Sequence, residues 1–209
     1  MYKTIVDFFQ DGGVFMYPIM IVLALGLAIA LERYIYISVI KRNNKKLLRT
    51  LLPLLQNGDF QGAFNVISKS NHAICRMLGQ GLTRMKSAAH RDEIETAMEE
   101  SMMETIPQIE KRTHYLAMFA NIATLLGLLG TIIGLIKAFT AVAAVDPALK
   151  GEILSTSISV AMNTTAFGLM TAIPLLFIYT VIQTKSTEVI DSLEMATVKF
   201  LNLMTKRKS

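Results

Sequence analysis

Apolar residues gather in three long runs along the chain, and none of these runs contains a charged side chain. Residues 12–31, 115–136 and 153–184 have no Asp, Glu, Lys or Arg. A helix rises about 1.5 Å per residue, so about 20 residues cross the ~30 Å hydrocarbon core of a bilayer. A charge-free core helix in a soluble domain is normally shorter. The pattern therefore predicts an all-α membrane protein with three transmembrane helices.

The runs also set an expected order of segments. The chain begins with an interfacial segment (residues 1–13), a first span (14–40) and a polar helical domain (41–114). A second span (115–139), a short loop (140–152), a third span (153–183) and a final helix (184–209) follow. Pro18 falls in the first turn of the first span, where its missing N–H costs little. Two of the three spans are thus expected to extend into a cytoplasmic helical domain.

The polar segment 41–114 is too long for a linker and too polar to cross a membrane. We expect short helices in it, broken at Pro53, Asn57-Gly58 and Asn71. From Asp92 onward, apolar residues at helical spacing oppose glutamates. The apolar positions are Ile94, Ala97, Met98, Met102, Ile106 and Ile109, and the glutamates are Glu95, Glu99 and Glu110. This stretch reaches the second span without a clear stop, which predicts one long helix with a kink at Pro107.

The final segment repeats this amphipathic pattern after the third span. Its apolar positions are Val189, Ile190, Leu193, Ala196, Val198 and Leu201. We expect them to form a helix that packs on residues 92–114.

Basic residues predict the orientation. Segment 41–114 holds twelve Lys and Arg residues and 185–209 holds five, whereas residues 1–13 and 140–152 hold one each. Because Lys and Arg favour the cytoplasmic side, we expect a periplasmic N-terminus and a cytoplasmic C-terminus. The net charge of +5 is then explained by topology and by contact with lipid headgroups rather than by nucleic acid. Asp7 and Asp11 argue against a cleaved signal peptide, so the first run is interpreted as a retained anchor.

Small and hydroxyl-bearing residues cluster on the second and third spans. The second span carries Gly127, Gly130 and Gly134, of which the last two form a small-xxx-small pair. The third span carries a stripe at helical spacing, made of Ser157, Ala161, Thr165, Gly168 and Ala172, with Thr164 beside it. Pro174 should leave the carbonyl of Met170 without its usual donor and kink the helix.

Two interpretations of this stripe stay open from the residues alone. Thr131 with Ser157, Asn163, Thr164 and Thr165 would line a hydrated path if the stripe faces water. Alternatively, the threonine hydroxyls bond back to carbonyls of their own helix. A lipid-facing helix has no reason to gather small polar residues on one side, which favours a helix interface or a pore.

Two segments resemble a known family. Asn121-Ile-Ala-Thr-Leu-Leu-Gly-Leu-Leu-Gly-Thr-Ile-Ile-Gly134 and Asn163-Thr-Thr-Ala-Phe-Gly-Leu-Met-Thr-Ala-Ile-Pro174 are similar to hallmark segments of the MotA/TolQ/ExbB ion-channel family. Tyr17-Pro18 and Leu31-Glu32-Arg33 resemble the matching first helix. The length and the three spans resemble the TolQ/ExbB branch more than the four-span MotA/PomA branch.

The resemblance implies a ring-forming oligomer, typically a homopentamer, in the bacterial inner membrane. Such a ring surrounds ExbD/TolR-like single-span partners that carry a membrane aspartate. Ion flow past that aspartate would move the partners, with a TonB/TolA-like protein as a further energy transducer. The ion-pathway roles of the family's two threonines are carried over to Thr131 and Thr165.

One position departs from proton-driven TolQ and ExbB proteins, which have a glutamate five residues before the third-span threonine. Val160 stands there. The string Val160-Ala-Met-Asn-Thr-Thr165 is closer to sodium-driven PomA-type proteins. Hard cations prefer oxygen ligands, so we expect Na⁺ to pass, with transient contacts at Thr131, Thr164 and Thr165, and H⁺ carried along chains of water is the alternative. We expect no resident metal or cofactor.

Two other classes of function compete with an ion-conducting subunit. A membrane scaffold or signalling anchor would work through segment 41–114, with the stripe as simple packing. A membrane enzyme would need a nucleophile–base pair, a metal-ligand set or a phosphate loop, and the sequence offers none of these.

Overall fold

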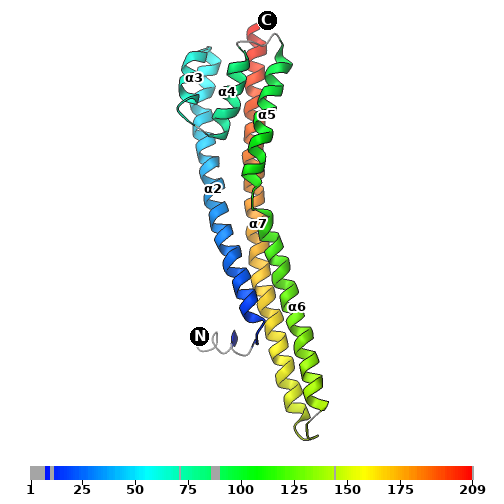
Figure 1. Ribbon diagram of the computed structural model, residues 1–209. Coiled ribbons are helices and arrows are strands. Elements are labelled where there is room, and N and C mark those ends of the chain that lie inside the picture. The colour runs from blue at the N-terminus through cyan, green and yellow to red at the C-terminus, as the bar shows by residue number, and fades with distance from the viewer. Residues whose placement is uncertain (1–7, 10–11, 71, 86–89, 144, 209) are drawn as a thin grey trace. The chain divides into compact units, whose positions relative to one another are not determined.

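The computed structural model describes residues 8–9, 12–70, 72–85, 90–143 and 145–208, and the described residues form helices without strands (Figure 1). The helices are α2 (Met16–Asn57), α3 (Phe60–Ile67), α4 (Ala73–Met85), α5 (Arg91–Glu110), α6 (His114–Ala143) and α7 (Lys150–Lys208). The segments Met16–Asn57, Arg91–Ala143 and Lys150–Met204 are long and apolar enough to cross a membrane. The predicted fold class, an all-α protein with three membrane-spanning helices, is confirmed.

The chain divides into two compact units that share α2 and α7. The first unit contains Met1–Glu32 and Arg112–Val181, and the second contains Arg33–Lys111 and Ile182–Ser209. Each unit therefore combines segments that are distant in sequence. We describe the units separately below.

In the first unit, α6 lies beside the first part of α7 (Figure 1). Their buried residues are mostly small, including Ala120, Ala123, Ala161 and Ala172. The start of α2 also packs on α7, because a Cβ atom on Gly26 would lie 2.8 Å from Leu175 Cδ2. Large apolar side chains, by contrast, are exposed on the outer faces of these helices, as a bilayer requires.

In the second unit, α4 and α5 pack against each other and against the end of α7. A Cβ atom on Gly81 would lie within about 3 Å of both Met98 and Phe200, so these three residues meet in one place. The Thr197 hydroxyl donates to Met77 Sδ at 3.2 Å. Of the expected apolar face on α7, Val189, Leu193, Ala196 and Leu201 are buried and Ile190 is partly buried, but Val198 is 54% exposed, so that assignment was wrong.

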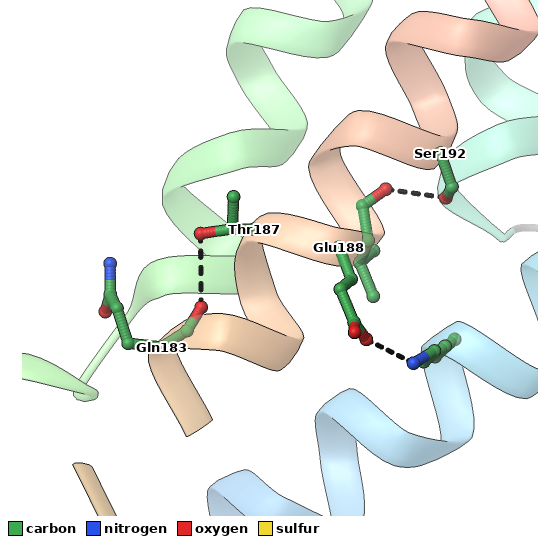
Figure 2. Close-up of polar contacts among 6 residues, drawn as sticks. Gln183, Thr187, Glu188 and Ser192 are labelled. Atoms are coloured by element: carbon green, nitrogen blue, oxygen red, sulfur yellow. Dashed lines mark hydrogen bonds and ion pairs between the residues drawn. The ribbon is translucent and has the colours of Figure 1, made fainter. Parts of the chain in front are cut away.

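Polar contacts also join α2 to α7 on the surface of the second unit. Lys41 forms an ion pair with Glu188, as Figure 2 shows, and both side chains are 48% exposed. Such an exposed pair contributes at most ~1 kcal/mol. In the same view, the hydroxyls of Thr187 and Ser192 donate to the backbone of α7 itself, at Gln183 and Val189.

The first helix is longer than predicted, because Pro53 does not break it. α2 continues past Ile40 through Pro53 to Asn57. Pro53 removes the usual donor to the carbonyl of Arg49, but Arg49 is exposed and water can replace that donor. The break at Asn57-Gly58 is confirmed, with Gly58 at a φ of 73°. Asn71 lies outside the described residues.

The predicted continuous helix over 92–139 was also wrong. α5 ends at Glu110 and α6 begins at His114. Between them Arg112 has a φ of 63°, a left-handed conformation that no helix interior adopts. Its guanidinium Nη1 lies 3.1 Å from Glu32 Oε2, which fixes the turn to α2. Pro107 lies inside α5 and its carbonyl accepts from Lys111 N–H at 2.9 Å.

The connection between α6 and α7 is shorter than the predicted loop, since helix extends at both ends of it. α6 continues to Ala143 and α7 begins at Lys150. α7 then stays helical across Pro174, through the expected boundary at 183 and on to Lys208. The membrane sides of these segments remain predictions.

Candidate functional site

Glycines on α6 let it approach α7 backbone to backbone. A Cβ atom on Gly127 would lie 3.2 Å from Thr165 Cα and 3.4 Å from Gly168 Cα. A Cβ atom on Gly134 would lie 2.9 Å from Ala161 Cβ. Close approach through small residues is how helices associate where lipid removes the hydrophobic driving force. The predicted stripe therefore forms an interface within one chain.

The close approach brings the hydroxyls of Thr131 and Thr165 together. The two oxygens contact each other across the helix pair. Thr165 donates to the Gly127 carbonyl at 2.9 Å, and Thr131 lies 3.3 Å from the carbonyls of both Gly127 and Ala161. Four oxygen atoms, two hydroxyl and two carbonyl, are thus gathered at one point. Both threonines are only partly buried, so the group borders the surface of the chain.

Most other threonines of the apolar helices behave differently. Thr124, Thr140, Thr156 and Thr180 donate to a carbonyl four residues back in their own helix. That is the usual way in which a hydroxyl is satisfied in lipid. Thr165 instead donates across to α6, which distinguishes it from a threonine that only satisfies itself.

Thr164 faces away from this oxygen group, toward the N-terminal segment. Its hydroxyl lies 2.6 Å from the Gly12 carbonyl and 3.1 Å from the Val160 carbonyl, and the residue is 2% exposed. A Cβ atom on Gly130 would lie 2.5 Å from Thr164 Cγ2. In the single chain the turn at Gly12 thus covers Thr164, and the expectation that it shares an ion contact with Thr131 and Thr165 stays a prediction.

The remaining predicted site residues are not drawn into the oxygen group. Ser157 lines a shallow pocket near the start of α7, together with Leu149, Glu152 and Thr156. Asn163 is half-buried on α7. Val160 lies beside Gly13, where a Cβ atom would be 3.3 Å from Val160 Cγ1.

Sequence reasoning missed two features around the site. The turn at Gly12 and Gly13, with a φ of 73° at Gly13, supplies the partner of Thr164. The adjacent glycines are the signal that could have revealed it. Thr171 is 1% exposed, and its hydroxyl has no partner among the described residues. Like Thr164, seven residues earlier, it lies beside the small stripe.

Chemically, the oxygen group can exchange hydrogen bonds with water or contact a hard cation. Hydroxyl and carbonyl oxygens are ligands that such cations accept. They do not titrate near neutral pH, and the described residues contain no cluster of His, Cys, Asp or Glu that could hold a metal. The stretches that carry this group, residues 115–136 and 153–184, contain no carboxylate.

Comparison with known proteins gives consistent results. The model of the MotA/TolQ/ExbB proton channel family matches residues 69–195. A protein of Methanothermobacter thermautotrophicus, called a putative biopolymer transport protein ExbB homolog, is 28% identical over 196 residues, covering 93% of this chain and 68% of that protein. The biopolymer transport protein exbB1 of Vibrio cholerae is 42% identical over 67 residues, which is 32% of this chain and 29% of that protein.

Proposed function

Because the chain belongs to the MotA/TolQ/ExbB proton channel family, we propose that it is the ion-conducting, stator-like subunit of an ion-driven membrane motor. Several copies form a ring, and the oxygen group of Thr131 and Thr165 borders its water-filled interior. Ion passage through the ring moves a partner protein inside it. One charge crossing ~150 mV releases about 3.5 kcal/mol, which is enough to rearrange a few interface contacts.

A single observation carries this proposal: Thr165 and Thr131 meet at a partly exposed point between two charge-free stretches, residues 115–136 of α6 and 153–184 of α7. Hydroxyls facing lipid would be satisfied within their own helix, as Thr124 and Thr180 are. Thr165 instead donates across to α6, and this contact is better explained by water or an ion passing beside the two threonines than by lipid. Gly127 contributes its carbonyl to the same group.

The transported ion in this proposal is Na⁺, with H⁺ as the alternative. Proton relay favours a titratable side chain, and residues 115–136 and 153–184 have no Asp or Glu. Val160 occupies the position where proton-driven relatives have a glutamate. Hydroxyl oxygens with a carboxylate from the partner form a suitable passage for a hard cation, although water chains could still carry protons.

The partner we propose is a single-span protein with a membrane aspartate, of the ExbD/TolR type, coupled to a TonB/TolA-like transducer. The ring is a homopentamer in the inner membrane, with the N-terminus outside and the second unit in the cytoplasm. The names of both relatives mention biopolymer transport, which supports transport of this kind as the powered process. The charge bias between 41–114 and 140–152 supports the orientation.

Ion flux in proteoliposomes tests the proposal. The chain is purified with its partner, reconstituted, and assayed for uptake of radioactive Na⁺ and for acidification under the same membrane potential. We expect uptake of Na⁺ that is lost in Thr165→Val and retained in Thr165→Ser. Thr164→Val is the matched control, because it removes one buried hydroxyl from the neighbouring position. Failure to recover any single-span partner would instead favour a scaffold.

A further inference from the structure

A polar cavity of about 350 Å³ lies inside the second unit, outside the apolar helix pair described above. α2 contributes Tyr36 and Asn44 to its lining, α4 contributes Arg76, and α5 contributes Thr105 and Gln108. The volume is at the lower end of the ~300–1,000 Å³ range of small-molecule sites. Residues from three separate helices line it, so this partly open cavity is formed by the tertiary fold.

Asn44 is the unusual residue of this cavity. It is 2% exposed and lies between two fully buried residues, Ile37 and Leu51, each seven positions away on α2. That spacing marks an apolar helix face, where leucine or alanine would normally stand. Yet neither Asn44 Nδ2 nor Asn44 Oδ1 has a partner among the described residues. A buried amide with both ends unused needs a ligand or ordered water.

Arg76 gives the cavity its charge. It is the one Lys, Arg, Asp or Glu among the lining residues of the described chain. Its Nη2 donates to Gln108 Oε1 at 3.3 Å, while its Nε is buried without a partner there. A second guanidinium, that of Arg33, is 3% exposed, donates to the Ile109 carbonyl and lies 4.7 Å above the Tyr36 ring. Ile109 and Tyr36 both line the cavity.

These groups specify the chemistry of an occupant. Arg76 Nε and Asn44 Nδ2 are donors that require acceptor oxygens, and no lining carboxylate competes for them. Asn44 Oδ1 requires a hydroxyl or similar donor. Guanidinium groups match the geometry of phosphate oxygens. We propose that this cavity binds a phosphate group whose substituent carries a hydroxyl, either as a soluble phosphate ester or as the headgroup of an anionic phospholipid.

A soluble ester and a lipid headgroup present the same phosphate chemistry, and the surroundings of the cavity allow either one to reach it. Tyr36 and Val39 line the cavity and are each 39% exposed, so an acyl chain could lie beside them. Lys41, Lys45 and Lys46 follow on the same helix and would attract an anionic leaflet. His72 is exposed at the cavity lining, where a soluble ester could enter.

Native mass spectrometry of the purified full-length assembly in maltoside tests the proposal. Inorganic phosphate, glycerol 3-phosphate and dioleoyl phosphatidylglycerol are titrated separately, and bound copies per subunit are counted. We expect saturable binding that Arg76→Gln weakens by about tenfold or more, because a charge-assisted hydrogen bond is lost. Arg84→Gln is the matched control on α4, since Arg84 is exposed and does not line the cavity.

Asn44→Leu provides a second, independent variant. It removes the unused amide while keeping the side-chain volume, so the ligand-free assembly should unfold at the same or a higher temperature. Binding should nevertheless fall by about tenfold. Binding of phosphatidylglycerol alone supports the lipid source, and binding of the soluble anions supports the ester. The proposal is overturned if none of the three probes binds, or if both cavity variants bind as well as Arg84→Gln.

Discussion

The Thr165 hydroxyl on α7 lies 2.9 Å from the Gly127 carbonyl on α6. This bond joins two helices at a position where a Cβ atom on residue 127 would be 3.2 Å from Thr165 Cα. Packing and polar chemistry therefore depend on each other here. A side chain at 127 would push the two backbones apart by at least a few tenths of an ångström, and the close approach brings Thr165 beside Thr131.

The backbone contact at Gly168 predicts a large effect of a single methyl group. Its Cβ would lie 2.7 Å from the Ala123 carbonyl and 3.1 Å from Gly127 Cα. Gly168→Ala should force α6 and α7 apart and destabilise the protein by about 1–3 kcal/mol. Thermal unfolding in detergent, followed by circular dichroism, measures this change.

Gly151→Ala is the matched control, because a Cβ atom there would meet no atom of the described residues within 4 Å beyond its own stretch of helix. As alanine has the higher helix propensity, this change should be neutral or stabilising by up to ~1 kcal/mol. Equal unfolding temperatures for the two variants would show that the helix pair does not pack as described.

The left-handed conformation of Arg112 predicts an order of stability among its variants. A non-glycine residue there costs roughly 1–2 kcal/mol, and the exposed pair with Glu32 returns at most ~1 kcal/mol. Arg112→Gly should thus be as stable as the natural chain or slightly more stable. Arg112→Val loses the same charge but should be about 1–2 kcal/mol less stable than Arg112→Gly.

Chemical unfolding of both Arg112 variants, followed by helix content, measures this difference. Because both variants lose the ion pair with Glu32, the difference between them measures the free-energy cost of the left-handed backbone conformation at residue 112. If Arg112→Val proves as stable as Arg112→Gly, α5 and α6 are joined in some other way than by a left-handed turn.

Cys75 predicts a loss of stability at alkaline pH. The residue is 1% exposed, and burial raises the pKa of its thiol, partly opposed by a hydrogen bond with the Ser70 side chain. The folded chain therefore holds this proton more tightly than the unfolded chain does. Its contribution to stability is complete below the ordinary pKa of a thiol and falls as the pH rises through the raised value.

Unfolding of the natural chain and of Cys75→Ala should therefore be compared from neutral pH to pH values well above the ordinary thiol pKa. The natural chain should lose stability more steeply than the variant over that alkaline range. Parallel curves for the two proteins would mean that the folded thiol ionises as an exposed one does.

The choice of ion is tested by replacing external Na⁺ with K⁺ or choline at constant membrane potential. Hydroxyl ligands on stretches without a carboxylate, residues 115–136 and 153–184, favour Na⁺, so motor activity in cells should stop. Thr165→Val should abolish activity in Na⁺ as well, while the ring still assembles on a sizing column. Activity that continues unchanged in choline assigns the current to protons.

The spans and the small stripe could be predicted because both depend on residue type and period. Residues 115–136 lack charge and Gly127, Gly130 and Gly134 recur at helical spacing, whatever the rest of the chain does. The direction of single side chains could not be predicted in the same way. Thr164 and Thr165 are neighbours, and only the position of Gly12 decides that one of them is covered.

Local breaks were predicted least well, because tertiary context overrides local preference. A proline usually ends a helix, but α2 continues through Pro53, and Arg49, whose carbonyl loses its usual donor, is an exposed residue. Arg112 gives no sign of a left-handed turn, since the partner that holds it, Glu32, is eighty residues away. The buried amide of Asn44 could not be predicted from the sequence either, because only the fold shows that this residue is buried.

The central claim is that the hydroxyl pair faces water inside the assembled ring. It is tested most directly by placing a cysteine at 165 in a Cys75→Ala background and measuring its reaction with a cationic, membrane-impermeant methanethiosulfonate. Ile173→Cys in the same background is the control, because Ile173 is 65% exposed on the apolar surface of α7. The account predicts that the cysteine at 165 reacts at least about tenfold faster than the one at 173. Equally slow reaction at both positions would place Thr165 in lipid or dry packing and contradict the account.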